Sequence, residues 1–273
     1  MTSTQAVISD ASHPTLSGRE LEFYDYWSTN VVNPADPHLQ RWIDYEEGAV
    51  DRAEERTAQL ETYEPVAGKR VLEIGCQNGA WLISLARAGA DPVGIDTEGN
   101  AVRAATVRGR CWDVAIDPRI GDACGLDFES NTFDIVASND VIEHVPDKVA
   151  MVREVMRVLR PGGLAVISAP QRFSLKHLRS DPHYQYAGVS VFPASGIRWY
   201  LTRLRGEAVY EVETLPTGHG IRRQFARHGG VVITPDGDPR RRPDGARAKA
   251  GSMARDVVDE LRQGFVIAVR KPA

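Results

Sequence analysis

Between Lys69 and Pro170 the sequence alternates short apolar runs with segments whose apolar residues recur at helical spacing. The runs read RVLEI, PVGID, PRIGD, FDIVAS and LAVISA, and helical patterns lie between most of them. Repeated strand and helix units of this kind form a parallel sheet with helices on both faces. The alternation therefore predicts an α/β fold for this region.

The flanking segments have other patterns. Residues 1–18 are small and polar and predict a flexible arm, and residues 19–67 predict an N-terminal helical lid ahead of a main domain over residues 68–273. Within the lid we expect one long helix over residues 38–61, and the aromatic stretch at residues 23–27 is either core packing or a cover for a ligand. Residues 236–251 are rich in Pro, Gly and Arg and predict a mobile loop. A helix over residues 218–228, a second over residues 252–263 and a final strand over residues 265–271 complete the pattern.

Composition excludes several classes of protein. Of the 273 residues 42% are hydrophobic and 26% are charged, which is ordinary for a soluble globular protein, and the net charge of −4 disfavours nucleic acid and anionic membranes as partners. Three cysteines, Cys76, Cys111 and Cys124, lack the spacing of a disulfide framework or a zinc site. Neither a signal peptide nor a run of about 20 apolar residues is present, so we expect a cytoplasmic protein.

The stretch VLEIGCQNG at residues 71–79 joins the first strand to the first helix of the alternating region. Gly75 and Gly79 allow a tight turn and close approach of a ligand, and the helix N-terminus offers free N–H groups. The spacing is G-x-x-x-G, with Gln77 where a dinucleotide fingerprint would place its middle glycine. The turn therefore predicts a site for a nucleotide-like ligand other than NAD, with a connector that binds no ligand as the alternative.

Acidic residues follow the next two strands. Asp96 ends the second strand about 20 residues after Gly75, where a carboxylate accepts the hydroxyl groups of a ribose. The alternative is an N-cap, because Asp96 or Thr97 precedes a helix. Asp122 and Ala123 end the third strand, where an acid can accept the amino group of an adenine.

Five motifs occur in a set order: VLEIGCQNG, VGID, GDACGLDF, FDIVASNDVIEHV, and VLRPGG followed by LAVIS. In this order they resemble the class I S-adenosylmethionine-dependent methyltransferases. The resemblance covers residues 69–170 and extends more loosely through residues 217–233 to the last strand. It implies a Rossmann-like, seven-stranded, mostly parallel sheet with helices on both faces and an antiparallel last strand.

The resemblance also implies a set of cofactor contacts. The methionyl part would lie on Glu73 and the backbone of the turn, the ribose on Asp96, the adenine on Asp122 and Ala123, and the sulfonium region near Asn139. Gln77 departs from the family pattern, which usually has glycine there. The full set expected to bind S-adenosyl-L-methionine is Glu73, Gly75, Cys76, Gln77, Gly79, Asp96, Thr97, Asp122, Ala123 and Asn139.

Asp140, Glu143 and His144 lie at positions i, i+3 and i+4 of NDVIEHVPD, so a helix here would place them on one face. Such a face suits a general base, with His144 and Asp140 as the catalytic residues, or a site for Mg²⁺, Mn²⁺ or Zn²⁺. A similar acidic pattern occurs in ubiquinone-pathway O-methyltransferases and small-RNA 3′-end methyltransferases. A fourth ligand would come from His177, His183 or His219, and structural packing is the third interpretation.

We expect methyl transfer to a small molecule, most simply to an oxygen of a hydroxylated, natural-product-like metabolite. An insertion over residues 171–216 would cover the acceptor pocket and bring the third catalytic candidate, His183, to it. The alternatives are a metal-dependent RNA ribose methyltransferase and a cofactor-binding partner protein without catalysis. The sequence leaves the oligomeric state open, a homodimer included.

Overall fold

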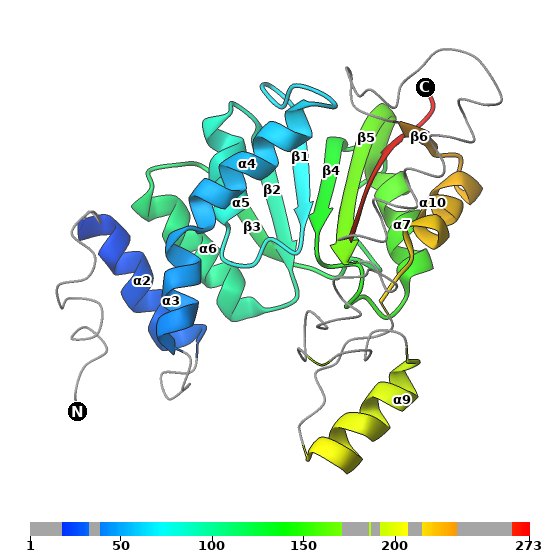
Figure 1. The fold of residues 1–273 in the computed structure, drawn as a ribbon. Coiled ribbons are helices and arrows are strands. Elements are labelled where there is room, and N and C mark those ends of the chain that lie inside the picture. Colours follow the sequence, from blue (N-terminus) through cyan, green and yellow to red (C-terminus); the bar gives the residue numbers. More distant parts are fainter. Residues whose placement is uncertain (1–17, 33–38, 171–185, 187–191, 207–214, 234–263) are drawn as a thin grey trace. The chain divides into compact units, whose positions relative to one another are not determined.

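A computed structural model of the chain describes residues 18–32, 39–170, 186, 192–206, 215–233 and 264–273 (Figure 1). The helices are α2 (Gly18–Asn30), α3 (Leu39–Glu47), α4 (Ala49–Glu61), α5 (Ala80–Arg87), α6 (Gly99–Cys111), α7 (Lys148–Val158), α9 (Ala194–Trp199), the π-helix η2 (Tyr200–Arg205) and α10 (Gly218–Arg227). The strands are β1 (Arg70–Ile74), β2 (Asp91–Asp96), β3 (Asp117–Ile120), β4 (Phe133–Asn139), β5 (Leu159–Pro170), β6 (Val231–Ile233) and β7 (Gly264–Arg270).

The strands form one seven-stranded sheet in the order β3-β2-β1-β4-β5-β7-β6. β1 pairs in parallel with β2, β2 with β3, and β4 with β5, whereas β7 runs antiparallel to both β5 and β6. The chain order of the strands reverses between β1 and β4, and open α/β sheets in general bind ligands at the carboxyl ends of their strands. The predicted Rossmann-like sheet with an antiparallel last strand is confirmed.

The chain divides into two compact units, Met1–Asp122 and Ala123–Ala273. In the first unit the sequence RVLEI forms β1 as expected, and Val71 and Leu72 are fully buried. Helix α4 packs against α5, and α2 packs against α6 (Figure 1). The N-terminal helices are therefore part of the packed structure of this unit.

Two helices replace the single helix expected over residues 38–61. α3 ends at Glu47 and α4 begins at Ala49, with Gly48 between them as the N-cap residue of α4. Glycine is one of the weakest helix formers, so a break at this position costs little. The sequence pattern missed the break because the apolar spacing continues across it.

Packing explains the aromatic stretch of α2. The rings of Phe23, Tyr24 and Trp27 are almost completely buried in a cluster with Ile43 of α3 and apolar residues of α6. Of the two interpretations left open, core packing therefore holds for these three rings. A lid function of residues 19–67 stays a prediction.

In the second unit α7 begins after Asp147, whose carboxylate accepts hydrogen bonds from the backbone N–H groups of Val149 and Ala150. The apolar spacing of VAMVREVMRVL predicts one buried stripe with Val149, Val152 and Val155, but Val149 is 44% exposed, because the capped first turn lies at the surface. Val152 and Val155 are buried as expected. None of the helices that the structure describes is long and apolar enough to cross a membrane.

Several predictions concern residues outside the described ranges. These are the arm, apart from Gly18 at the start of α2, the loop over residues 236–251, the helix over residues 252–263 and most of the insertion over residues 171–216. Within that insertion the described residues 192–206 include α9 and η2.

Candidate functional site

The turn between β1 and α5 is built from residues with left-handed backbone conformations. Gly75, Gln77 and Gly79 have φ angles of 80°, 44° and 76°. The N–H groups of Gly75 and Cys76 donate to the carbonyl oxygen of Ile95 in β2, at 2.8 and 2.9 Å, and Gly79 N–H donates to the Cys76 carbonyl at 2.8 Å. The loop is thus tied to the neighbouring strand, although Gln77 holds a conformation that is unfavourable for a residue with a side chain.

Asp96 at the end of β2 is fixed by two backbone groups. Its Oδ2 atom accepts a hydrogen bond from Gln77 N–H at 2.9 Å, and its Oδ1 atom accepts one from Glu98 N–H at 3.0 Å. The N-cap residue of α6 is Glu98, so the interpretation of Asp96 or Thr97 as the cap is wrong. Each carboxylate oxygen has a second lone pair, so the held carboxylate can still accept hydroxyl groups.

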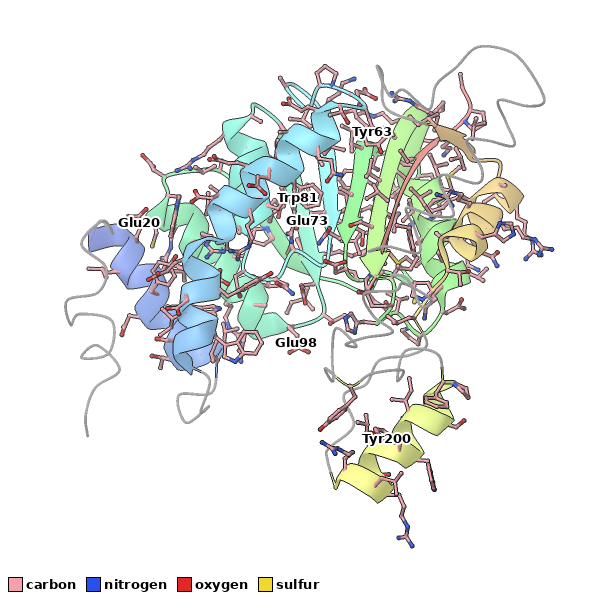
Figure 2. The ribbon with its side chains drawn as sticks, in the orientation of Figure 1. Glu20, Tyr63, Glu73, Trp81, Glu98 and Tyr200 are labelled. Carbon is pink, nitrogen blue, oxygen red and sulfur yellow. The ribbon has the colours of Figure 1, made fainter. Side chains whose placement is uncertain are left out.

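Glu73 lies near the carboxyl end of β1, where Figure 2 labels it. The side chain is 5% exposed, and its Oε2 atom has no hydrogen-bond partner among the residues that the structure describes. Burial raises the pKa of Glu73 to about 8; the negative charge of Asp96 also raises it, and Arg56 opposes the shift. A buried carboxyl oxygen without a hydrogen-bond partner lowers the stability of the fold unless a bound ligand supplies that hydrogen bond.

These features fit the expected cofactor. The loop offers closely approachable backbone, Asp96 offers a pre-oriented acceptor for hydroxyl groups, and Glu73 offers an unpaired acceptor for an amino group. Asp122 is exposed and follows the end of β3 by two residues, while Ala123 is buried. Asp122 ends the first unit and Ala123 begins the second, so their adenine contact stays a prediction.

In the second unit polar groups meet at the carboxyl ends of β4 and β5. The Oδ1 atom of Asn139 accepts a hydrogen bond from the hydroxyl of Ser168, and its Nδ2 atom donates to Asp140 Oδ2 at 2.8 Å. Asp140 N–H donates to the Ser168 carbonyl at 3.0 Å. The side chain of Asn139, expected near the sulfonium region, is thereby held in one orientation.

The stretch from Asp140 to His144 is a turn, so the prediction of a shared helical face is wrong. Asp140 has a φ of 55°, which departs from the helical path directly after β4, and His144 N–H donates to the Val141 carbonyl at 2.8 Å. Asp140 is exposed, Glu143 is 1% exposed and His144 is half-buried. The three side chains therefore differ in environment and do not share one face.

The predicted metal site is not supported by this arrangement. Among the described residues no group of three His, Cys, Asp or Glu side chains is placed to hold a metal ion. Burial raises the pKa of Glu143 to about 8, and the charge of Asp140 also raises it, so in the metal-free protein this carboxyl is largely protonated at neutral pH. His219 of α10 is exposed, and His177 and His183 lie outside the described residues.

His144 has the environment of a proton acceptor. Burial lowers its pKa below the ordinary 6.5; the charge of Asp140 raises it in part, and Lys148 lowers it further. The imidazole is therefore neutral at pH 7, the form that can accept a proton.

Three residues near the loop were missed by sequence reasoning. Asn78 lies inside the turn and is 9% exposed, and Arg108 of α6 and Glu46 of α3 are also buried. Arg108 Nη1 donates to the Asn78 carbonyl at 3.0 Å. A signal was present, because Arg108 continues the helical stripe of Ala101, Ala104 and Ala105, where an apolar residue is expected.

Comparison with known proteins assigns a family to the central region. Residues 72–167 match the family described as a methyltransferase domain. A ubiquinone biosynthesis O-methyltransferase of Ralstonia nicotianae is 35% identical over 120 residues, which are 44% of this chain and 50% of the relative. A protein of Mycolicibacterium smegmatis, named "Probable S-adenosylmethionine-dependent methyltransferase", is 35% identical over 170 residues, 61% of this chain and 63% of the relative. The matched region thus spans half the length of the first relative and less than two thirds of the second.

Solved structures share the fold. An S-adenosylmethionine-dependent methyltransferase from Mesorhizobium loti aligns with a TM-score of 0.56 at 20% identity, over 81% of this chain and 99% of that one. The cyclase SpnF aligns with a TM-score of 0.55 at 19% identity, over 82% of each chain. At such identities the likeness concerns the fold alone, and the fold occurs in proteins named for different reactions.

Proposed function

Because this chain belongs to the class I S-adenosylmethionine-dependent methyltransferases, we propose that it transfers a methyl group from S-adenosylmethionine to an oxygen of a small hydroxylated metabolite. Binding of S-adenosylmethionine is supported by the fixed loop over residues 75–79. Gln77 N–H in this loop is bonded to the carboxylate of Asp96 at the end of β2, and the buried carboxyl of Glu73 lies near the end of β1. Oxygen as the acceptor atom is supported by relatives such as the ubiquinone biosynthesis O-methyltransferase of Ralstonia nicotianae.

Each residue of the cofactor half has a defined task in this proposal. Glu73 loses its proton, and its carboxylate accepts hydrogen bonds from the amino group of the methionine moiety. The loop backbone lies close to the same moiety. Asp96 accepts the ribose hydroxyls, Asp122 and Ala123 bind the adenine, and Asn139 borders the sulfonium region. S-adenosylmethionine supplies a methyl carbon activated by positively charged sulfur, so the protein mainly orients the acceptor and removes its proton.

His144 is the proposed general base. Its neutral imidazole accepts the proton of the acceptor hydroxyl, and the negative charge of Asp140 stabilises the imidazolium that forms. His183, outside the described residues, remains a second candidate on the acceptor side. Because the described part of the chain contains no group of three side chains placed to hold a metal ion, no step is assigned to one.

The proposal is tested first by binding. Calorimetry is expected to detect S-adenosylmethionine and S-adenosylhomocysteine and no NAD. Asp96→Ala is expected to weaken binding by about 1 to 3 kcal/mol, the range for a lost hydrogen bond to a charged group. Asp117→Ala is the matched control, because Asp117 is a half-buried aspartate of the adjacent strand that pairs with Arg119. NAD binding without any response to S-adenosylmethionine would contradict the assignment.

Turnover is tested with phenolic and aliphatic hydroxylated acceptors, with mass spectrometry of the products. Methyl ethers that form only with intact His144 are the expected result. Methylation at nitrogen or carbon would retain the family and overturn the choice of oxygen. A rearranged acceptor without an added methyl group would identify a reaction like that of the cyclase neighbour.

A further inference from the structure

A buried ion pair lies behind the cofactor loop in the first unit. Arg108 of α6 is fully buried, and its Nη2 atom pairs with Oε1 of Glu46, which is 8% exposed in its side chain. The guanidinium also stacks on the ring of Phe23 in α2, 3.9 Å from the ring centroid. The N-terminal helices α2 and α3 therefore supply both the counter-charge and an aromatic face for a cation of α6.

This pair is bonded to the loop itself. Arg108 Nη1 donates to the Asn78 backbone carbonyl at 3.0 Å, and Asn78 Nδ2 donates to Glu46 Oε2 at 3.3 Å. Asn78 is thus held at its backbone by the cation and at its side chain by the carboxylate. Both members of the pair are connected to one loop residue.

The connection continues to the proposed ribose acceptor. Asn78 directly follows Gln77, whose N–H orients the carboxylate of Asp96. Gln77 occupies a left-handed conformation, which persists only where surrounding contacts impose it. The bonds of Asn78 to Arg108 and Glu46 are contacts of this kind.

We propose that Glu46 and Arg108 are positioning residues that couple docking of the N-terminal helices to the shape of the cofactor loop. When Glu46 is in place, Arg108 is neutralised and holds the Asn78 carbonyl, so the loop is fixed before the cofactor binds. Removing one partner of a buried pair leaves an uncompensated charge, which destabilises the surrounding contacts. The cofactor part of this inference rests on the proposed function, whereas the loop part does not.

The test uses the full-length protein and two variants, Glu46→Gln and Arg108→Lys. Glu46→Gln removes the counter-charge with little change in size. Arg108→Lys keeps the positive charge but lacks the planar fork that reaches both Asn78 and Glu46. In both variants the amides of residues 75–79 in the free protein are expected to exchange hydrogen about 3- to 30-fold faster, and affinity for S-adenosylhomocysteine is expected to fall by a similar factor.

Two matched controls separate positioning from general stability. Val107→Ala removes packing from the same helix and the same core cluster while leaving the ion pair intact. Arg110→Gln removes an equal charge from an exposed position on that helix. All measurements are made well below the unfolding transition of each variant. Both controls are expected to retain wild-type loop exchange and affinity, even where Val107→Ala lowers stability.

Coupling is reciprocal, so S-adenosylhomocysteine is expected to slow exchange of the α3 amides in the wild-type protein. This measurement needs no variant and remains informative if Glu46→Gln fails to fold. Unchanged loop exchange in Arg108→Lys together with unprotected α3 would overturn the inference and leave the pair as ordinary packing. Faster loop exchange in a protein whose wild type binds no S-adenosylhomocysteine would support the coupling and reject the proposed function.

Discussion

Gln77 occupies a position of the turn where glycine was expected from the family pattern, and its backbone is nevertheless held by a hydrogen bond. Its side chain is exposed, whereas its backbone N–H donates a hydrogen bond to the carboxylate of Asp96. The contact to Asp96 therefore depends on the backbone and not on the side chain. A glycine would adopt the same conformation with less strain. The departure therefore affects the energy of the loop more than its hydrogen bonds.

Glu73 gives the first prediction, which concerns stability against pH. Its pKa is about 8 in the folded protein and 4.5 ordinarily, so between these values the folded protein binds more protons than the unfolded chain. The free energy of unfolding therefore falls as pH rises through this window. Glu73→Gln cannot ionise and is expected to reduce the fall by about 1 to 3 kcal/mol, measured by urea unfolding between pH 5 and about 8.

Glu98→Gln serves as the control, because Glu98 is exposed at the start of α6 (Figure 2). It is expected to follow the wild-type pH dependence. If Glu73→Gln also follows it, the carboxyl of Glu73 ionises normally in the folded protein.

His144 gives the second prediction, which concerns activity. Because burial lowers its pKa, the acid limb of the pH profile of kcat/KM is expected below pH 6.5, with a plateau at neutral pH. His144→Ala is expected to lose about 10²- to 10⁴-fold in kcat while retaining affinity for S-adenosylhomocysteine. Near-normal turnover in this variant would assign the side chain a structural role.

At the scale of elements, the loop is also held by close packing on α6. A Cβ atom on Gly79 would lie 2.8 Å from the Cβ and 3.2 Å from the Cα of Ala105. Gly79 therefore has a left-handed backbone conformation, and at Gly79 the loop packs directly against α6. This contact fixes where α5 begins relative to α6.

The third prediction compares two glycines with nearly equal φ angles. Gly68 has a φ of 73° and nothing within 4 Å of its Cβ position, so Gly68→Ala is expected to cost only backbone strain, about 1 to 2 kcal/mol. Gly79→Ala adds a clash with α6 and is expected to lose about 1 to 3 kcal/mol more. Thermal and urea unfolding of the two variants measure the difference, and equal losses would show that the loop and α6 separate without cost.

At the scale of the whole molecule, metal dependence gives the fourth prediction. The described carboxylates and imidazoles do not form a three-ligand cluster, so methyl transfer is expected to be unchanged after EDTA treatment and removal of the chelator. Activity that is lost in EDTA and restored by Mg²⁺, Mn²⁺ or Zn²⁺ would restore the metal interpretation. Buffer controls with each metal alone exclude direct effects of the ions.

The sequence predicted the elements of the central region well because their signals are local. Strand β1 and helices α5 and α7 follow from apolar spacing over a few residues, and the turn follows from two glycines. The break at Gly48 was missed because the apolar spacing continues across it, and the exposure of Val149 was missed because spacing alone does not show that the first turn of α7 lies at the surface. The turn after Asp140 was missed because residue spacing alone does not report backbone conformation.

What the sequence determined by itself was the sheet, the glycine turn between β1 and α5 and the acid at the end of β2, since each depends on consecutive residues with a defined spacing. Only the tertiary structure decided that Arg108 pairs with Glu46, 62 positions away, and that the pair is bonded to Asn78. It also decided that Glu143 is buried while Asp140 is exposed. The reason is physical: burial and the pairing of distant charges depend on which chain segments pack together, and local spacing carries no information about that choice.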